Sequence, residues 1–137
     1  MPESPSIKPY IYRAAFVLYL FIVAYLCFAN FNDIPDIPRK FLGIRIDKIV
    51  HFCMFLPFPA ICYMAYGKKD GTPLQALATA VVILAIGCIF AGITEIIQGM
   101  LPHRVEDIRD FGADMLGIGI SSIITFITAI KGIKRSK

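Results

Sequence analysis

Titratable and amide side chains gather where the apolar segments of this 137-residue sequence begin and end. Carboxylates and histidine accept hydrogen bonds or transfer protons, whereas lysine and arginine bind anions. We predict a binding site made by Asp47, Lys48, His51, Glu95, Gln98, Arg104, Asp110 and Asp114. Within it, His51 and Glu95 are the candidate catalytic groups, His51 as a general acid or base.

Two of these carboxylates lie inside or at the edge of an apolar segment. An ionised carboxylate at the centre of a bilayer costs about 2.5–3.5 kcal/mol even on the mildest scale. Glu95 and Asp114 are therefore expected to have a hydrogen-bond partner, to contact water or to take part in function. They are the strongest candidates for function.

The composition predicts an integral membrane protein. Hydrophobic residues make up 57% of the chain and charged residues 18%, against about 45–50% and 25% in soluble domains. The net charge of +4 is small and follows the loops and termini. It orients the chain in a membrane, so no nucleic-acid partner is expected.

The elements that must position the polar groups are apolar runs of membrane-spanning length, which takes about 17–25 residues. We expect an all-α polytopic protein, residues 1–137 forming a single membrane domain with spans at about 11–29, 49–66, 75–97 and 112–130. Pro57 and Pro59 should kink the second span. Residues 1–9 and 131–137 are expected to be cytoplasmic tails, and residues 30–48 a loop.

Four antiparallel spans place both termini on one side and the polar span ends in one leaflet. Eight lysines and arginines lie in the tails and middle turn, against six in the other two loops, which favours cytoplasmic termini and an outer-leaflet pocket. Asp47 and His51, like Asp110 and Asp114, are four residues apart and share a helix face. We expect His51 to bond Asp47 or Glu95.

Structural explanations compete with the functional one for several of these residues. Asp110 is placed to cap the fourth span. Arg104 can hold its loop by pairing with Asp107 or Asp110. Glu106 and Asp107 are expected to be solvated loop charges.

No cofactor or metal motif is present in the sequence. The cysteines lie singly in apolar runs and form no CxxC pair, and neither a glycine-rich phosphate loop nor GxSxG occurs. We therefore expect no cofactor, no metal site and no disulfide.

The order of the motifs resembles the VanZ-like membrane proteins over about residues 47–121. The matching pieces are Asp47-Lys48-x-x-His51-Phe52, Glu95-x-x-Gln98, Pro102-x-Arg104 and Asp110-x-x-x-Asp114-x-x-Gly117. The resemblance implies roles for Asp47, His51, Glu95, Gln98, Arg104 and Asp110. The family is named after an accessory protein that raises resistance to teicoplanin, and its biochemical activity is unsettled. This chain departs from the family at His103, where glycine is usual, and at Asp114, where asparagine is usual.

Three functions fit these patterns. The first is an outward-facing site in a bacterial plasma membrane for an anionic lipid or lipid-linked cell-wall precursor. There Lys48 and Arg104 would hold phosphate or carboxylate, and Glu95 and Asp114 would hold hydroxyl or amine groups. The second is an intramembrane enzyme that uses His51. The third is a small transporter or ion pathway that works as a homo-oligomer, since polar groups line only one leaflet of a single chain.

Overall fold

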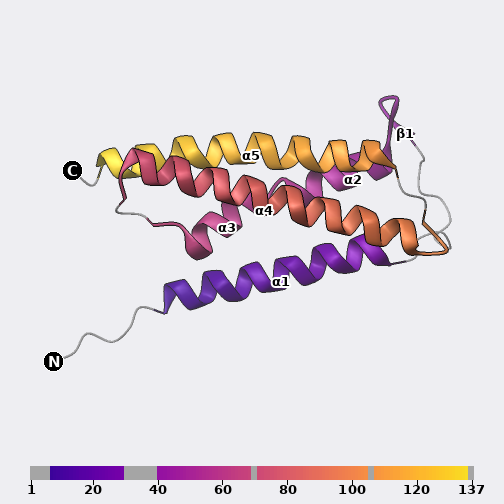
Figure 1. Ribbon diagram of the computed structural model, residues 1–137, viewed down its shortest axis with the longest axis horizontal. Coiled ribbons are helices and arrows are strands. Elements are labelled where there is room, and N and C mark those ends of the chain that lie inside the picture. The colour runs from indigo at the N-terminus through magenta and orange to yellow at the C-terminus, as the bar shows by residue number, and fades with distance from the viewer. Residues whose placement is uncertain (1–6, 30–39, 69–70, 105–106, 136–137) are drawn as a thin grey trace.

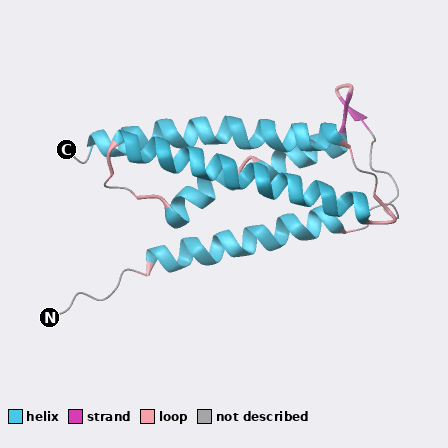
Figure 2. Ribbon diagram, viewed as in Figure 1, coloured by secondary structure: helices cyan, strands magenta, loops and turns pink. Residues whose placement is uncertain are grey.

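Helices make up most of the computed structural model, which describes residues 7–29, 40–68, 71–104 and 107–135 (Figures 1 and 2). The helices and strands are α1 (Lys8–Phe28), β1 (Lys40–Phe41), β2 (Ile44–Arg45), α2 (Ile46–Phe55), α3 (Phe58–Tyr66), α4 (Pro73–Met100) and α5 (Ile108–Arg135). The predicted helical architecture is confirmed, with one short hairpin added to it.

Among the residues that the structure describes, four helical segments are long and apolar enough to cross a membrane, namely α1, α2 with α3, α4 and α5. The chain is thus a multi-pass membrane protein by length and composition. The helices extend beyond the predicted spans because hydropathy detects only their apolar middles. Lys8 and Pro9 belong to α1, and α5 continues to Arg135 through most of the expected tail. Residues 1–6, 30–39 and 136–137 of the expected tails and loop lie outside the described residues.

The predicted break in the second span separates α2 from α3. Proline has no backbone N–H, so Pro57 and Pro59 cannot donate to the carbonyls four residues earlier. α2 ends at Phe55 and α3 begins at Phe58, each with its own hydrogen-bonded turns.

α5 packs against both α4 and α2, while α1 lies along the side of the bundle (Figure 1). Gly117 permits the close approach of α5 to α2, because a Cβ atom there would lie 2.7 Å from the carbonyl oxygen of Phe52. Phe55, Phe58 and Ile118 fill the space between the helices and are almost fully buried. The start of α1 and the end of α5 lie at one end of the bundle, and the polar ends of α2, α4 and α5 lie at the other.

A β-hairpin occupies residues 40–45 of the loop expected at 30–48, and α2 already begins at Ile46. β1 and β2 pair antiparallel, with Lys40 opposite Arg45 and Phe41 opposite Ile44. The two linking residues, Leu42 and Gly43, have φ angles of 50° and 80°. Tight hairpin turns of the type I′ class require such positive φ angles. For a residue other than glycine, this conformation is less stable by about 1–2 kcal/mol.

Candidate functional site

Lys48 is the cationic centre of a group of polar side chains at the start of α2. Its Nζ lies 2.8 Å from Oδ2 of Asp107 and 2.6 Å from Oδ1 of Asp110, and its side chain is 16% exposed. One ammonium group therefore joins the beginning of α2 to the beginning of α5, 59 and 62 residues away in sequence. Charge-assisted hydrogen bonds of this kind are about twice as strong as neutral ones.

His51 and Asp114 form a buried pair one turn deeper. His51 Nδ1 lies 2.9 Å from Asp114 Oδ1, with side-chain exposures of 5% and 0%. The close approach of α2 and α5 at Gly117 brings the two side chains within reach. His51 was expected to bond Asp47 or Glu95, and the structure pairs it with Asp114.

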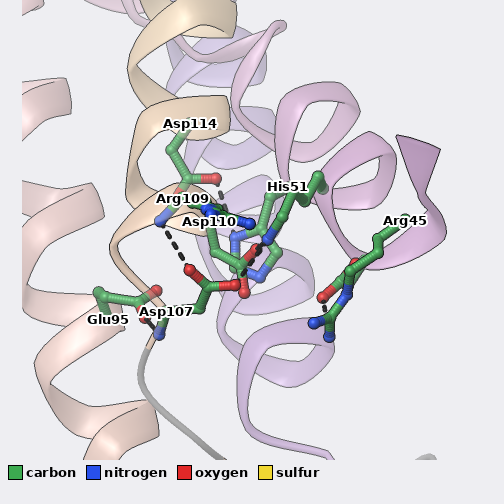
Figure 3. A network of polar contacts seen from close by, with 9 residues as sticks. Arg45, His51, Glu95, Asp107, Arg109, Asp110 and Asp114 are labelled. Carbon is green, nitrogen blue, oxygen red and sulfur yellow. Dashed lines mark hydrogen bonds and ion pairs between the residues drawn. The ribbon is translucent and has the colours of Figure 1, made fainter. Parts of the chain in front are cut away.

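Glu95 reaches the same place from the end of α4. Its Oε1 accepts a hydrogen bond of 2.7 Å from the backbone N–H of Asp107. Figure 3 shows Glu95, Asp107, Asp110, Asp114 and His51 close together where the three helices meet. We call this group of residues the polar cluster: Lys48, His51, Glu95, Asp107, Asp110 and Asp114.

Two carboxylate oxygens of the polar cluster are buried without a hydrogen-bond partner among the described residues. They are Oε2 of Glu95 and Oδ2 of Asp114. An unpartnered buried acceptor costs about 1–3 kcal/mol. Native proteins rarely keep such atoms, and each one requires an explanation.

Asp107 is the member of the polar cluster that the sequence reasoning did not include in the site. It was expected to be a solvated loop charge, yet it contacts Lys48, Glu95 and the backbone N–H of Arg109. The last contact, 2.9 Å long, makes Asp107 the cap of α5, a role expected of Asp110. An aspartate directly before a helix is the usual capping signal and identifies this residue. The hydrogen bond from Lys48, aided by the N–H of Arg109, lowers the pKa of Asp107 below its ordinary 3.8.

Gln98 and Arg104 hold α1 in place instead of joining the polar cluster. Gln98 Nε2 donates to the carbonyl oxygen of Cys27 at 2.9 Å. Arg104 Nη2 donates to the carbonyls of Leu26 and Ala29 at 3.3 and 3.4 Å. The last carbonyls of a helix have no partner within the helix, and these side chains supply one. The expected pairing of Arg104 with Asp107 or Asp110 is replaced by these contacts.

His103 adds to the same connection, with Nε2 at 3.2 Å from the carbonyl oxygen of Phe28. A residue without a polar side chain here could not make this contact with α1.

Asp47 lies outside the polar cluster. It pairs with Arg45 at 2.8 Å, and the two side chains are 27% and 60% exposed. Arg45 stands apart from the buried acids in Figure 3. Exposed pairs of this kind contribute about 0–1 kcal/mol. The structure thus brings together five of the eight predicted residues, namely Lys48, His51, Glu95, Asp110 and Asp114.

The polar cluster offers acceptor atoms and a histidine held by a carboxylate. In the part of the chain that the structure describes, no three His, Cys, Asp or Glu side chains are placed to hold a metal ion. Glu106, expected to be a solvated charge, lies outside the described residues. The arrangement can receive hydrogen-bond donors from a ligand or exchange a proton through His51.

Comparison with known proteins gives one informative similarity. No protein-family model matches this chain, and no solved structure matches it. An uncharacterized protein from Schizosaccharomyces pombe is 29% identical over 115 residues, which are 83% of this chain and 62% of that protein. The chain therefore spans less than two thirds of the length of this relative, which itself is uncharacterized.

Proposed function

We propose that this protein is a VanZ-like membrane protein whose polar cluster binds the head group of a membrane lipid or of a lipid-linked envelope precursor. The observation that supports this most directly is the pair of buried, unpartnered oxygens on Glu95 and Asp114. Each would be satisfied by a donor from a ligand. Burying them without one is unfavourable, so a ligand explains why both carboxylates are present.

The contacts of the cations narrow the chemistry of the ligand. Lys48 is shared by two carboxylates, and Arg104 is engaged by α1 carbonyls. The atoms left for a ligand are acceptors, which favours a head group with hydroxyl or ammonium donors. The expectation that Lys48 and Arg104 hold a phosphate stays a prediction. To bind one, Lys48 would have to release its carboxylates and Arg104 its α1 carbonyls.

A separate observation bears on whether the ligand is a membrane lipid or a lipid-linked cell-wall precursor. Yeasts make no peptidoglycan, so the similarity to the S. pombe protein favours an ordinary membrane lipid over a cell-wall precursor. The excess of lysine and arginine in the tails and the middle turn, eight against six in the other two loops, supports cytoplasmic termini, with the polar cluster in the outer leaflet. A bacterial plasma membrane and a role in teicoplanin resistance enter this proposal through the VanZ-like resemblance alone.

Lipid retention tests the proposal. The purified protein is reconstituted with equal amounts of phosphatidylethanolamine, phosphatidylglycerol and phosphatidylcholine, and the retained lipids are measured by native mass spectrometry. The first two head groups carry donors and phosphatidylcholine carries none, so the first two should be preferred. A lipid-linked cell-wall precursor added in a second arm separates the two ligand classes.

Two variants and one matched control complete this experiment. Asp114→Asn and Glu95→Gln should each weaken retention about tenfold, which corresponds to about 1.4 kcal/mol. Asp47→Asn makes the same charge change at the same end of the bundle, outside the polar cluster, and should retain lipid like the wild type. Equal retention by all four proteins, or no preference for donor-bearing head groups, contradicts the proposal.

The His51–Asp114 pair supports a second candidate function, an intramembrane acid–base enzyme. A carboxylate bonded to Nδ1 orients an imidazole so that Nε2 can exchange protons with a substrate, as in hydrolytic triads. Turnover of a labelled lipid by the wild type and not by His51→Gln would support this. Persistence of turnover in His51→Gln would exclude the assignment of His51.

A further inference from the structure

The hairpin β1–β2 has two chemically different faces. Directly opposite residues of an antiparallel pair lie on the same face, and successive residues alternate between faces. The Phe41–Ile44 pair therefore makes one face apolar, and the Lys40–Arg45 pair makes the other face basic. The hairpin is amphipathic although it contains only two residues in each strand.

The apolar residues of this hairpin are largely uncovered by the rest of the protein. Phe41 is 61% exposed, Leu42 87% and Ile44 53%. Leu42 also occupies a turn position with φ of 50°, where asparagine, aspartate or glycine is usual. An exposed apolar side chain on a strained backbone is unfavourable in water. We therefore expect an apolar environment outside the protein to cover Leu42.

The position of the hairpin indicates which environment covers these apolar side chains. It projects sideways from the polar end of the bundle, across the direction of the helices (Figure 1). It leads directly into α2. Since spanning helices run roughly along the membrane normal, the hairpin lies along the membrane surface at the depth of the helix ends. This is the interfacial layer, where apolar side chains meet lipid and basic side chains meet head groups.

We infer that the β1–β2 hairpin is an interfacial anchor that inserts Phe41, Leu42 and Ile44 into the surrounding leaflet and presents Lys40 and Arg45 to anionic head groups. Lys40 is exposed, and Arg45 keeps 60% of its side chain exposed while paired with Asp47. Each basic side chain near an anionic surface is attracted to it. This inference depends on the hairpin alone and stands apart from the ligand of the polar cluster.

The absence of tryptophan from the chain provides a direct test. Phe41→Trp introduces a single fluorophore into the full-length protein at the apolar face. The variant is placed in nanodiscs, which leave both membrane faces open, with phosphatidylglycerol and phosphatidylcholine brominated near the head group or deep in the acyl chains. Ile123→Trp, at an exposed position in the middle of α5, is the control for deep lipid contact.

For Phe41→Trp we expect strong quenching by shallow bromines, weak quenching by deep ones, and acrylamide quenching about threefold weaker than that of free tryptophan, as for an interfacial residue. Acrylamide quenching equal to that of free tryptophan, with no bromine effect, would overturn the inference. Protection from acrylamide without bromine quenching would also overturn it and would assign this face to a second copy of the chain.

A charge variant tests the preference for anionic lipid. In Phe41→Trp, quenching by shallow bromines should increase when the bromines are carried by phosphatidylglycerol instead of phosphatidylcholine. Adding Lys40→Gln should roughly halve that increase, because one of the two basic side chains is removed. The same quenching in both lipids, with and without Lys40, would refute the role of the basic face.

Discussion

At the end of the bundle where α1 begins and α5 finishes, polar groups stay near the surface and are paired conventionally. Thr72 and Gln75 cap α4 through two reciprocal hydrogen bonds of 3.0 and 3.2 Å, and Arg13 lies over the ring of Tyr66. At the opposite end, carboxylates from α4 and α5 are buried, and two of their oxygens have no partner among the described residues.

The two ends differ in whether their polar side chains are needed to satisfy the free backbone groups of a helix end. The capping box at the start of α4 shows that this sequence can satisfy the free backbone groups of a spanning helix with exposed side chains. Burying Glu95 and Asp114 at the other end is therefore not needed to end a helix. Residues that break the usual rules of burial are expected at functional sites.

The largest predicted effect concerns the contact that positions the polar end. Gly117→Ala places a Cβ atom 2.7 Å from the carbonyl oxygen of Phe52 and 3.2 Å from the N atom of Leu56. Backbone atoms cannot rotate away, so α2 and α5 must separate. The cost should be about 1–3 kcal/mol, at the upper end of this range.

Thermal unfolding in detergent measures this cost, and Gly119→Ala is the matched control. Its added Cβ meets nothing within 4 Å on the same helix. Gly119→Ala should melt at or above the wild-type temperature, because alanine is the better helix former, and Gly117→Ala should melt clearly below it. Similar losses for both would mean that helix flexibility, and not the contact with α2, is responsible.

The next effect tests the charge balance of the polar cluster. Lys48→Gln leaves Asp107 and Asp110 without their ammonium partner in a site that is only 16% exposed at the lysine. Loss of one partner of a mostly buried ion pair should cost about 2 kcal/mol. Lys40→Gln, an exposed lysine at the same end, should change stability by less than about 0.5 kcal/mol. Equal melting temperatures for the two variants would show that Lys48 is solvated.

A smaller effect is expected at the end of the bundle where α1 begins and α5 finishes. Thr72→Ala removes the side-chain acceptor of the capping box and should lower stability by about 1 kcal/mol. Because this cap is far from the polar cluster, lipid retention should stay at the wild-type value. Loss of retention together with stability would remove the distinction between the two ends.

The smallest effect is a pH dependence at Asp107. The hydrogen bond from Lys48 lowers the pKa of Asp107 below its ordinary 3.8. A carboxylate whose pKa is lower in the folded state stabilises the fold above its unfolded pKa, and this contribution is lost as the pH falls through the folded pKa. The difference in melting temperature between wild type and Asp107→Asn should thus be complete above about pH 4 and disappear in stronger acid. A difference independent of pH would contradict the ion pair.

Sequence reasoning predicted the helices well because a bilayer imposes a simple requirement on length and polarity. The kink followed from Pro57 and Pro59, whose missing donors are visible in the sequence. The hairpin was missed because Leu42 occupies the first turn position, where asparagine, aspartate or glycine is usual, and because the strands are only two residues long. Hydropathy placed the helix ends too far inward, since charged turns of α5 such as that of Arg135 remain helical.

The sequence could predict which polar residues gather at one end of the bundle, and only part of the contacts among them. Antiparallel spans bring Lys48, Glu95 and Asp114 to one end without further information. Sequence spacing cannot choose between partners on different helices, so His51 was expected to bond a different carboxylate. The contacts of Gln98 with α1 depend on how α1 packs, which no local pattern encodes.

The most direct test of the central claim is an experimental structure of the protein in a lipid nanodisc that contains donor-bearing head groups. If the polar cluster binds a lipid head group, density for a hydroxyl or ammonium group should lie about 3 Å from Oε2 of Glu95 and Oδ2 of Asp114. Lipid density elsewhere, with both oxygens hydrogen-bonded to side chains or backbone of the protein itself, would contradict this proposal.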